Sequence, residues 1–118
     1  MPKTIILDTN FILDSIKFKI DIRSEISRVL DESFTLSIFN ITKNELRGKE
    51  HGKLALQLLE KLNVNLLETT QPNVDSAILH LDNNNLIVAT ADKKLKEKLK
   101  KRNIPILVIR QKQHLKLI

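Results

Sequence analysis

Several residue types that support common protein chemistries are missing from this 118-residue sequence. It has no cysteine, which excludes disulfides, zinc ribbons and thiol nucleophiles and fits a reducing compartment. It has no tyrosine or tryptophan, so aromatic platforms for stacking bases are not expected. No apolar run approaches the roughly 18 residues of a membrane span, and the N-terminal segment lacks the pattern of a secretory signal. These absences predict a cytoplasmic protein without zinc.

What the sequence does contain is apolar and basic. Hydrophobic residues make up 42%, which is enough for one compact domain over residues 1–118. The formal net charge is +6, which favours a polyanionic partner such as nucleic acid. The alternative is a lysine-rich surface that serves solubility. Because phenylalanine is the only aromatic residue type, nucleic-acid binding would depend mainly on phosphates.

The hydrophobic pattern alternates between strands and helices. Continuous apolar or β-branched runs, typical of strands covered on both faces, lie at residues 4–7, 35–39, 63–68, 86–90 and 105–109. Helical periodicity lies at residues 11–30 in two pieces, from Thr42 to near Gly48, and at 53–62, 72–82 and 93–102. In the helix over residues 53–62, the expected buried stripe is Leu54, Leu58 and Leu62. The alternation predicts an α/β protein, a three-layer α/β/α sandwich with a parallel sheet of about five strands.

Four acidic residues follow four of these strands. Asp8 ends the first strand, and Asp92 directly follows the fourth. Glu45 is expected in the first turn of the helix after the second strand, and Asp75 in the first turn of the helix after the third. The carboxyl ends of parallel strands meet at one edge of the sheet, where open α/β sheets bind ligands. The topology therefore predicts that the four acids converge there.

Each acid also has a structural explanation. Asp8 and Asp92 suit helix N-caps, Asp75 suits the positive end of a helix dipole, and Thr42-x-x-Glu45 has the form of a capping box. A cap contributes only about 1 kcal/mol, whereas two carboxylates about 5 Å apart repel by roughly 3 kcal/mol at an effective dielectric of about 20. A convergent set of acids therefore needs a cation. All-oxygen ligands suit Mg²⁺ or Mn²⁺.

Two polar residues lie beside these acids in the sequence. Asn10 follows Asp8 by two positions, and Thr90 precedes Asp92 by two. A side-chain amide and a hydroxyl in these places can hold a carboxylate or a water in a supporting position around the metal site. The alternative is ordinary turn and strand-end hydrogen bonding.

The segments that carry these residues are ILDTNFIL, ITKNELRG, VDSAIL, VATADKKLKEKL and the tail IPILVIRQKQHLKL. Together they resemble PIN-domain nucleases, in the archaeal branch related to small-subunit rRNA-processing nucleases and to the toxin ribonucleases of toxin–antitoxin pairs. The resemblance implies an endoribonuclease acting on single-stranded RNA, usually with Mg²⁺ or Mn²⁺. It makes Asp8, Glu45, Asp75 and Asp92 the catalytic, metal-binding acids. Close relatives often carry Asp-Asp where this sequence has Asp75-Ser76, which bears on metal affinity and on a second metal.

A basic run lies directly after the last of these acids. Lys93, Lys94, Lys96 and, in the tail, Arg110 are the predicted RNA-binding residues, because cations that neutralise phosphates give sequence-independent affinity. The alternative is a solvated helix face. The partners implied are RNA, an antitoxin or a ribosomal assembly partner, and a second copy of the chain. A dimer would use the leucines around Leu59, for which core packing is the alternative.

Two other functions place acids at the edge of a parallel sheet. One is a noncatalytic RNA-binding or ribosome-assembly factor on the same fold, which Ser76 motivates. The other is a receiver-like signalling domain, which needs an aspartate at the end of the third strand and a lysine after the fifth. The segments LLETT and IPILVIR lack those residues, and this argues against a receiver.

Overall fold

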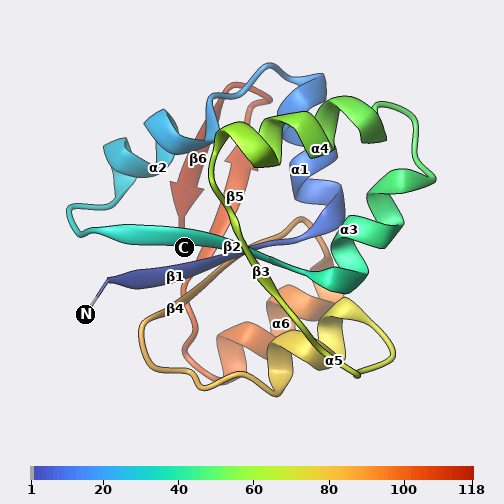
Figure 1. Ribbon diagram of the computed structural model, residues 1–118. Helices are drawn as coiled ribbons and strands as arrows, with labels where there is room; N and C mark the ends of the chain where they lie inside the picture. Colours follow the sequence, from blue (N-terminus) through green and yellow to red (C-terminus); the bar gives the residue numbers. More distant parts are fainter. Residues whose placement is uncertain (1) are drawn as a thin grey trace.

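Figure 1 shows the fold in a computed structural model that describes residues 2–118. The strands in this part of the chain are β1 (Lys3–Leu7), β2 (Phe34–Phe39), β3 (Asn65–Leu67), β4 (Leu86–Ala89), β5 (Ile106–Arg110) and β6 (His114–Leu117). The helices are α1 (Thr9–Lys17), α2 (Ile22–Val29), α3 (Asn40–Arg47), α4 (Gly52–Lys61), α5 (Val74–Leu79) and α6 (Lys93–Lys101). None of these helices is long and apolar enough to cross a membrane.

The strands form one sheet with the order β3-β2-β1-β4-β5-β6. The neighbours among β1 to β5 are parallel, and β6 is antiparallel to β5. β1 is central, with its residues in register with β2 on one side and β4 on the other. The chain crosses over from one strand to the next parallel strand through helices, so the predicted α/β sandwich is confirmed.

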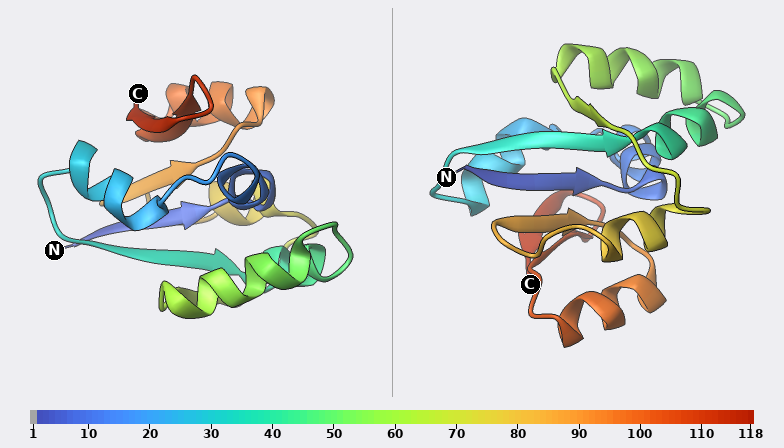
Figure 2. Two further views of the ribbon diagram at one scale, coloured as in Figure 1. Left: turned by 90° about the horizontal axis from the view of Figure 1, so that it is seen from above. Right: turned by 60° about the horizontal axis from the view of Figure 1, so that its bottom comes forward.

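The two faces of the sheet carry two separate hydrophobic clusters. In β1, side chains alternate between the faces, so Ile5 and Leu7 join one cluster while Ile6 joins the other. The first cluster includes residues of α1, α2 and α4, and the second includes residues of α5 and α6. Figure 2 shows these helices on either side of the sheet. All three β1 side chains are fully buried, which explains the unbroken apolar run in the sequence.

The antiparallel strand β6 was not among the five strands predicted. Its sequence, HLKL, is short and half polar, so its pattern alone is weak. Tertiary contacts hold it in place: Leu115 is fully buried, and its backbone amide donates to Glu25 of α2 at 2.8 Å. Arg28 of α2 donates to the carbonyl oxygen of Leu115 at 2.7 Å. The strand thus depends on a helix about 90 residues earlier in the chain, which a local pattern does not report.

Helix α3 begins two residues earlier than predicted, and the expected capping box is absent. Its N-cap is Phe39, the last residue of β2, and no side chain caps it. Asn40 anchors this junction, because its amide oxygen accepts from Thr69 N at 3.1 Å and its amide nitrogen donates to Thr69 O at 3.3 Å. The helix therefore starts directly from the strand. As a consequence Glu45 lies in the second turn of α3, and the expectation that it lies in the first turn is wrong.

The buried face of α4 differs from the predicted leucine stripe. Ala55 and Leu59 are buried, whereas Leu54 is 51% exposed. The other two predicted leucines, Leu58 and Leu62, are half-buried and pack against the core. At the start of the helix, a Cβ atom on Gly52 would lie 1.7 Å from the carbonyl oxygen of Leu46, so glycine is needed for this close approach. Leu59 packs in the core, which was the alternative to a dimer contact.

Candidate active site at the carboxyl edge of the sheet

The four predicted acids line one cleft of about 200 Å³. Asp8 follows β1, and Glu45 lies on α3, the helix after β2. Asp75 lies at the start of α5, and Asp92 follows β4. Figure 1 shows why they meet, since β1 and β2 end side by side where α1, α3 and α5 begin. The convergence predicted from the strand order is therefore present in the fold. The catalytic role of these residues is taken up below as a proposal.

Asp8 is the most enclosed of the four carboxylates. Its Oδ1 accepts from the backbone amide of Thr9 at 2.8 Å, and its Oδ2 accepts from the hydroxyl of Thr90 at 2.8 Å. Burial raises the pKa of Asp8 above its usual range, the two hydrogen bonds lower it, and the nearby Asp75 and Glu45 raise it. Asp8 thus accepts hydrogen bonds from neutral groups, and the charged residues near it, Asp75 and Glu45, are acidic.

Thr90, predicted as a supporting residue, connects two of the acids. It is fully buried at the end of the β4 segment, where its hydroxyl donates to Asp8 and accepts from the backbone amide of Asp92 at 3.1 Å. Asp92 in turn caps α6 by accepting from Leu95 N at 3.1 Å. Asp92 therefore does cap α6, which was the alternative explanation for this residue. Its second carboxylate oxygen takes no part in the cap.

Glu45 is held by a residue that sequence reasoning did not assign. The hydroxyl of Thr9 donates to Glu45 Oε1 at 2.7 Å. Thr9 is buried at the start of α1, whereas Glu45 is exposed on α3, 36 positions away. The signal available in the sequence was the DTN triplet itself, in which a hydroxyl residue directly follows the strand-terminal acid. Asn10, the other predicted supporting residue, is exposed and lines the cleft.

Asp75 lies in the first turn of α5, as predicted, behind the N-cap Asn73. Burial raises the pKa of Asp75, the nearby Asp92 raises it further, and Lys98 of α6 lowers it. Asp75 and Glu45 therefore raise the pKa of Asp8, and Asp92 raises the pKa of Asp75. Ser76, the residue that follows Asp75, is half-buried.

The cleft offers oxygen ligands and little compensating charge. No ion pair among residues 2–118 involves any of the four acids. No group of three or more histidine, aspartate or glutamate side chains in that range is arranged closely enough to hold a metal ion directly. A Mg²⁺-type ion is usually bound by one or two carboxylates and several waters, so the paired acids and their oxygen donors fit such an ion. The donor set does not suit zinc, because histidines and cysteines do not line the cleft.

Three of the predicted RNA-binding residues belong to α6, which begins directly after Asp92, and the fourth ends β5. Lys93 and Lys94 begin α6 directly after Asp92 and are exposed, Lys96 is half-buried, and Arg110 is exposed at the end of β5. Another basic residue lines the cleft itself and was not predicted. It is Lys49, from the short connection between α3 and α4.

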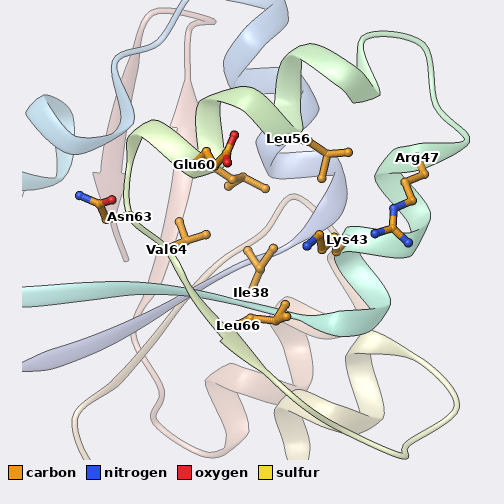
Figure 3. Close-up of a pocket in the computed structure, with 9 residues that line it drawn as sticks. Ile38, Lys43, Arg47, Leu56, Glu60, Asn63, Val64 and Leu66 are labelled. Atoms are coloured by element: carbon orange, nitrogen blue, oxygen red, sulfur yellow. The ribbon is translucent and has the colours of Figure 1, made fainter.

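A larger groove, of about 480 Å³, lies elsewhere on the molecule. Figure 3 shows its apolar side chains from β2, β3 and α4, with Lys43 and Arg47 on the α3 side. Glu60 is the one acidic side chain among the described residues that line it. This groove lacks convergent acids, so the smaller cleft is the candidate active site.

Comparisons with known proteins agree with this geometry. The sequence matches the PIN-like domain family over residues 5–112. It is 40% identical to ribonuclease VapC4 of Methanocaldococcus jannaschii, over 93% of this chain and 92% of that protein. The fold is similar to the solved structure of the PIN domain endonuclease Utp24, with a TM-score of 0.82 and 26% sequence identity, covering 98% of this chain and 91% of that one. The resemblance seen in the sequence is confirmed: the chain belongs to the PIN-like domain family.

Proposed function

We propose that this chain is an endoribonuclease that depends on Mg²⁺ or Mn²⁺, with residues 1–118 acting as one nuclease domain. The observation that carries the proposal is the cleft in which Asp8, Glu45, Asp75 and Asp92 come together without an ion pair to any basic residue among residues 2–118. The relative at 40% identity is a ribonuclease, and the similar solved structure is an endonuclease, which supports RNA as the substrate and phosphodiester cleavage as the reaction.

The four acids are the residues that would hold the divalent ion. Such an ion activates water at neutral pH and stabilises charge on the leaving oxygen. The protein supplies positioning: Thr90 fixes the Asp8 carboxylate and the start of α6, and Thr9 fixes Glu45. Burial leaves the Asp8 carboxylate poorly solvated, so that a cation bound to it would be attracted more strongly than in open water. Asn10 and Thr90 thus act as supporting residues around the acids.

Binding of RNA is assigned to basic residues near the cleft. Lys93, Lys94, Lys96 and Arg110 can neutralise phosphates on either side of the cleaved bond and give an affinity that falls as salt rises. A toxin-like role implies an antitoxin as partner, and an rRNA-processing role implies a ribosomal assembly partner. Cleavage of a panel of structured and unstructured RNAs separates the two roles, because ribosomal processing requires a defined structured site.

The test of the proposed function uses Asp8→Asn. This change keeps the size of the side chain and removes its charge, so we expect loss of Mn²⁺-dependent cleavage by about 10³-fold or more. Wild-type cleavage should also stop in EDTA. The matched control is Asp31→Asn, which makes the same change at an exposed position outside the cleft and should leave cleavage intact. Undiminished cleavage by Asp8→Asn would overturn the proposal.

A second candidate is a noncatalytic RNA-binding or assembly factor on the same fold. Ser76 favours it, because a serine stands where close relatives often carry a second acid. RNA binding that is equal in Mn²⁺ and in EDTA, together with no cleavage of any RNA in the panel, would support this candidate over the nuclease.

A further inference from the structure

The connection between α3 and α4 is a tight corner of four residues. Its backbone is fixed by two hydrogen bonds, from Lys49 N to Leu46 O at 3.2 Å and from Gly52 N to Lys49 O at 3.0 Å. His51 adopts the left-handed conformation with φ of 64°. Gly52 allows α4 to approach the Leu46 carbonyl, where a Cβ atom would lie 1.7 Å from the oxygen. The corner is therefore held against the end of α3 at Gly52, and it carries the exposed Lys49.

Lys49 stands apart from the other basic residues of the chain by its location. It lines the same cleft as Asp8, Glu45, Asp75 and Asp92, and it is the one lysine or arginine among the described residues that do so. It is exposed, and the ion pairs found in residues 2–118 do not include it. Its ammonium group is therefore available to a ligand that enters the cleft.

The charge of the cleft shows which ligand this would be. Four carboxylates repel a polyanionic substrate at the place where it has to bind, and the lysines of α6 do not line the cleft. An exposed lysine in the wall of the cleft attracts one phosphate to that place, because lysine acts as a compact point charge. Its position on a different element from α6 gives the RNA backbone a contact at the α3–α4 corner as well.

We infer that Lys49 binds a backbone phosphate of the RNA next to the cleaved bond and so positions the substrate over the acids. This inference rests on the proposed endoribonuclease function for its substrate class. The competing role is an internal counter-charge for the acids, in which Lys49 touches no substrate. The two roles differ in whether Lys49 contacts an RNA phosphate.

The first test compares Lys49→Met with Lys49→Arg and with the control Lys53→Met. Lys53 is an exposed lysine of α4 that does not line the cleft. We expect Lys49→Met to raise KM for a short single-stranded RNA by about tenfold with a smaller change in kcat, and to lower the salt slope of metal-free binding by about one. Lys49→Arg should recover most of the affinity, and Lys53→Met should stay within about twofold of wild type. A Lys49→Met variant that matches Lys53→Met would overturn the inference.

The second test identifies the phosphate. RNAs that carry a single uncharged methylphosphonate are bound in EDTA, with the linkage moved one position at a time along the strand. At one linkage the difference between wild type and Lys49→Met should disappear, since the partner of the lysine is already neutral. A difference that persists at every linkage would show that Lys49 acts only on the acids. Because this readout is binding without metal, it stands even if the wild-type chain cleaves no RNA, which is the result that would refute the proposed function.

Discussion

Two carboxylates of this protein, Glu25 and Asp8, have opposite surroundings. Glu25 on α2 accepts two hydrogen bonds from Arg28, at 3.1 and 3.2 Å, and one from Leu115 N at 2.8 Å. The Arg28 hydrogen bonds and then the Leu115 amide lower the pKa of Glu25. Asp8 receives hydrogen bonds only from neutral groups, and burial raises its pKa. The structural acid has a cation of its own, whereas the cleft acid lacks one.

The two acids therefore change stability with pH in opposite directions. Glu25 has a lowered pKa, so its contribution to the free energy of unfolding is present above the ordinary value of 4.5 and is lost as the pH falls through the lowered pKa. Asp8 has a raised pKa, so its contribution is present below 3.8 and is lost as the pH rises through the raised pKa. At neutral pH the hydrogen bonds of Glu25 with Arg28 and with the Leu115 amide, which join α2 to β6, are formed entirely within the chain. The Asp8 carboxylate has no ion pair among residues 2–118.

The variant Thr90→Val should have the largest effect on the cleft acids. The variant keeps the shape of a fully buried side chain but leaves Asp8 and the Asp92 amide without their shared partner. We expect cleavage to fall by about 10- to 100-fold and the free energy of unfolding to fall by about 1–3 kcal/mol. Cleavage rates and thermal unfolding measure the two effects. Thr35→Val, at an exposed position of β2, is the control, and equal cleavage by both variants would show that the Thr90 hydroxyl has no role at the acids.

A change of intermediate size should follow from adding a second basic residue to the cleft, which Lys49 already lines. Asn10 is exposed and lines the cleft, so Asn10→Lys places a second ammonium group among the acids. We expect the pKa of Asp8 to fall, stability in EDTA at pH 7 to rise, and Mn²⁺-dependent cleavage to decrease by about tenfold, since the lysine and the metal compete for the same charge. Asn10→Met, which removes the amide without adding a charge, controls for loss of the native amide. Faster cleavage by Asn10→Lys would contradict a competition between the two cations.

The smallest effect should come from Glu25→Gln, which weakens the contacts that join α2 to β6. We expect the free energy of unfolding at pH 7 to fall by about 1 kcal/mol because the charge-assisted bonds weaken, with cleavage unchanged. The difference between wild type and variant should be present above pH 4.5 and vanish as the pH falls through the lowered pKa of Glu25. Thermal unfolding across pH 2–7 follows it. A difference that grows toward acid would mean that the Glu25 charge does not support β6.

The sequence was sufficient for those features that depend on local pattern and strand order. The buried run before Asp8 and the apolar positions Leu95 and Leu99 of α6 mark their elements, and the parallel order brings the acids to one edge. Contacts between distant residues were out of reach, as for Thr9 with Glu45. Their formation depends on how helices are rotated and where they begin.

The α3–α4 corner illustrates that limit. Gly52 is one of two glycines in the chain, and its meaning appears only when the Leu46 carbonyl is seen against it. Beyond this corner Leu54 lies on the exposed side of α4, against the predicted stripe, and within it Lys49 lines the cleft. Lys49 therefore looked like any other surface lysine in the sequence.

The claim on which the proposed function depends is that the cleft acids bind a divalent ion, since no ion pair among residues 2–118 balances their charge. Calorimetric titration of Mn²⁺ into EDTA-stripped protein at pH 7 tests it most directly, with wild type, Asp8→Asn and Asp31→Asn compared. We expect binding by wild type and by Asp31→Asn, and a loss of binding in Asp8→Asn. No heat of binding at millimolar Mn²⁺ in the wild type, or equal binding by all three proteins, would contradict the claim.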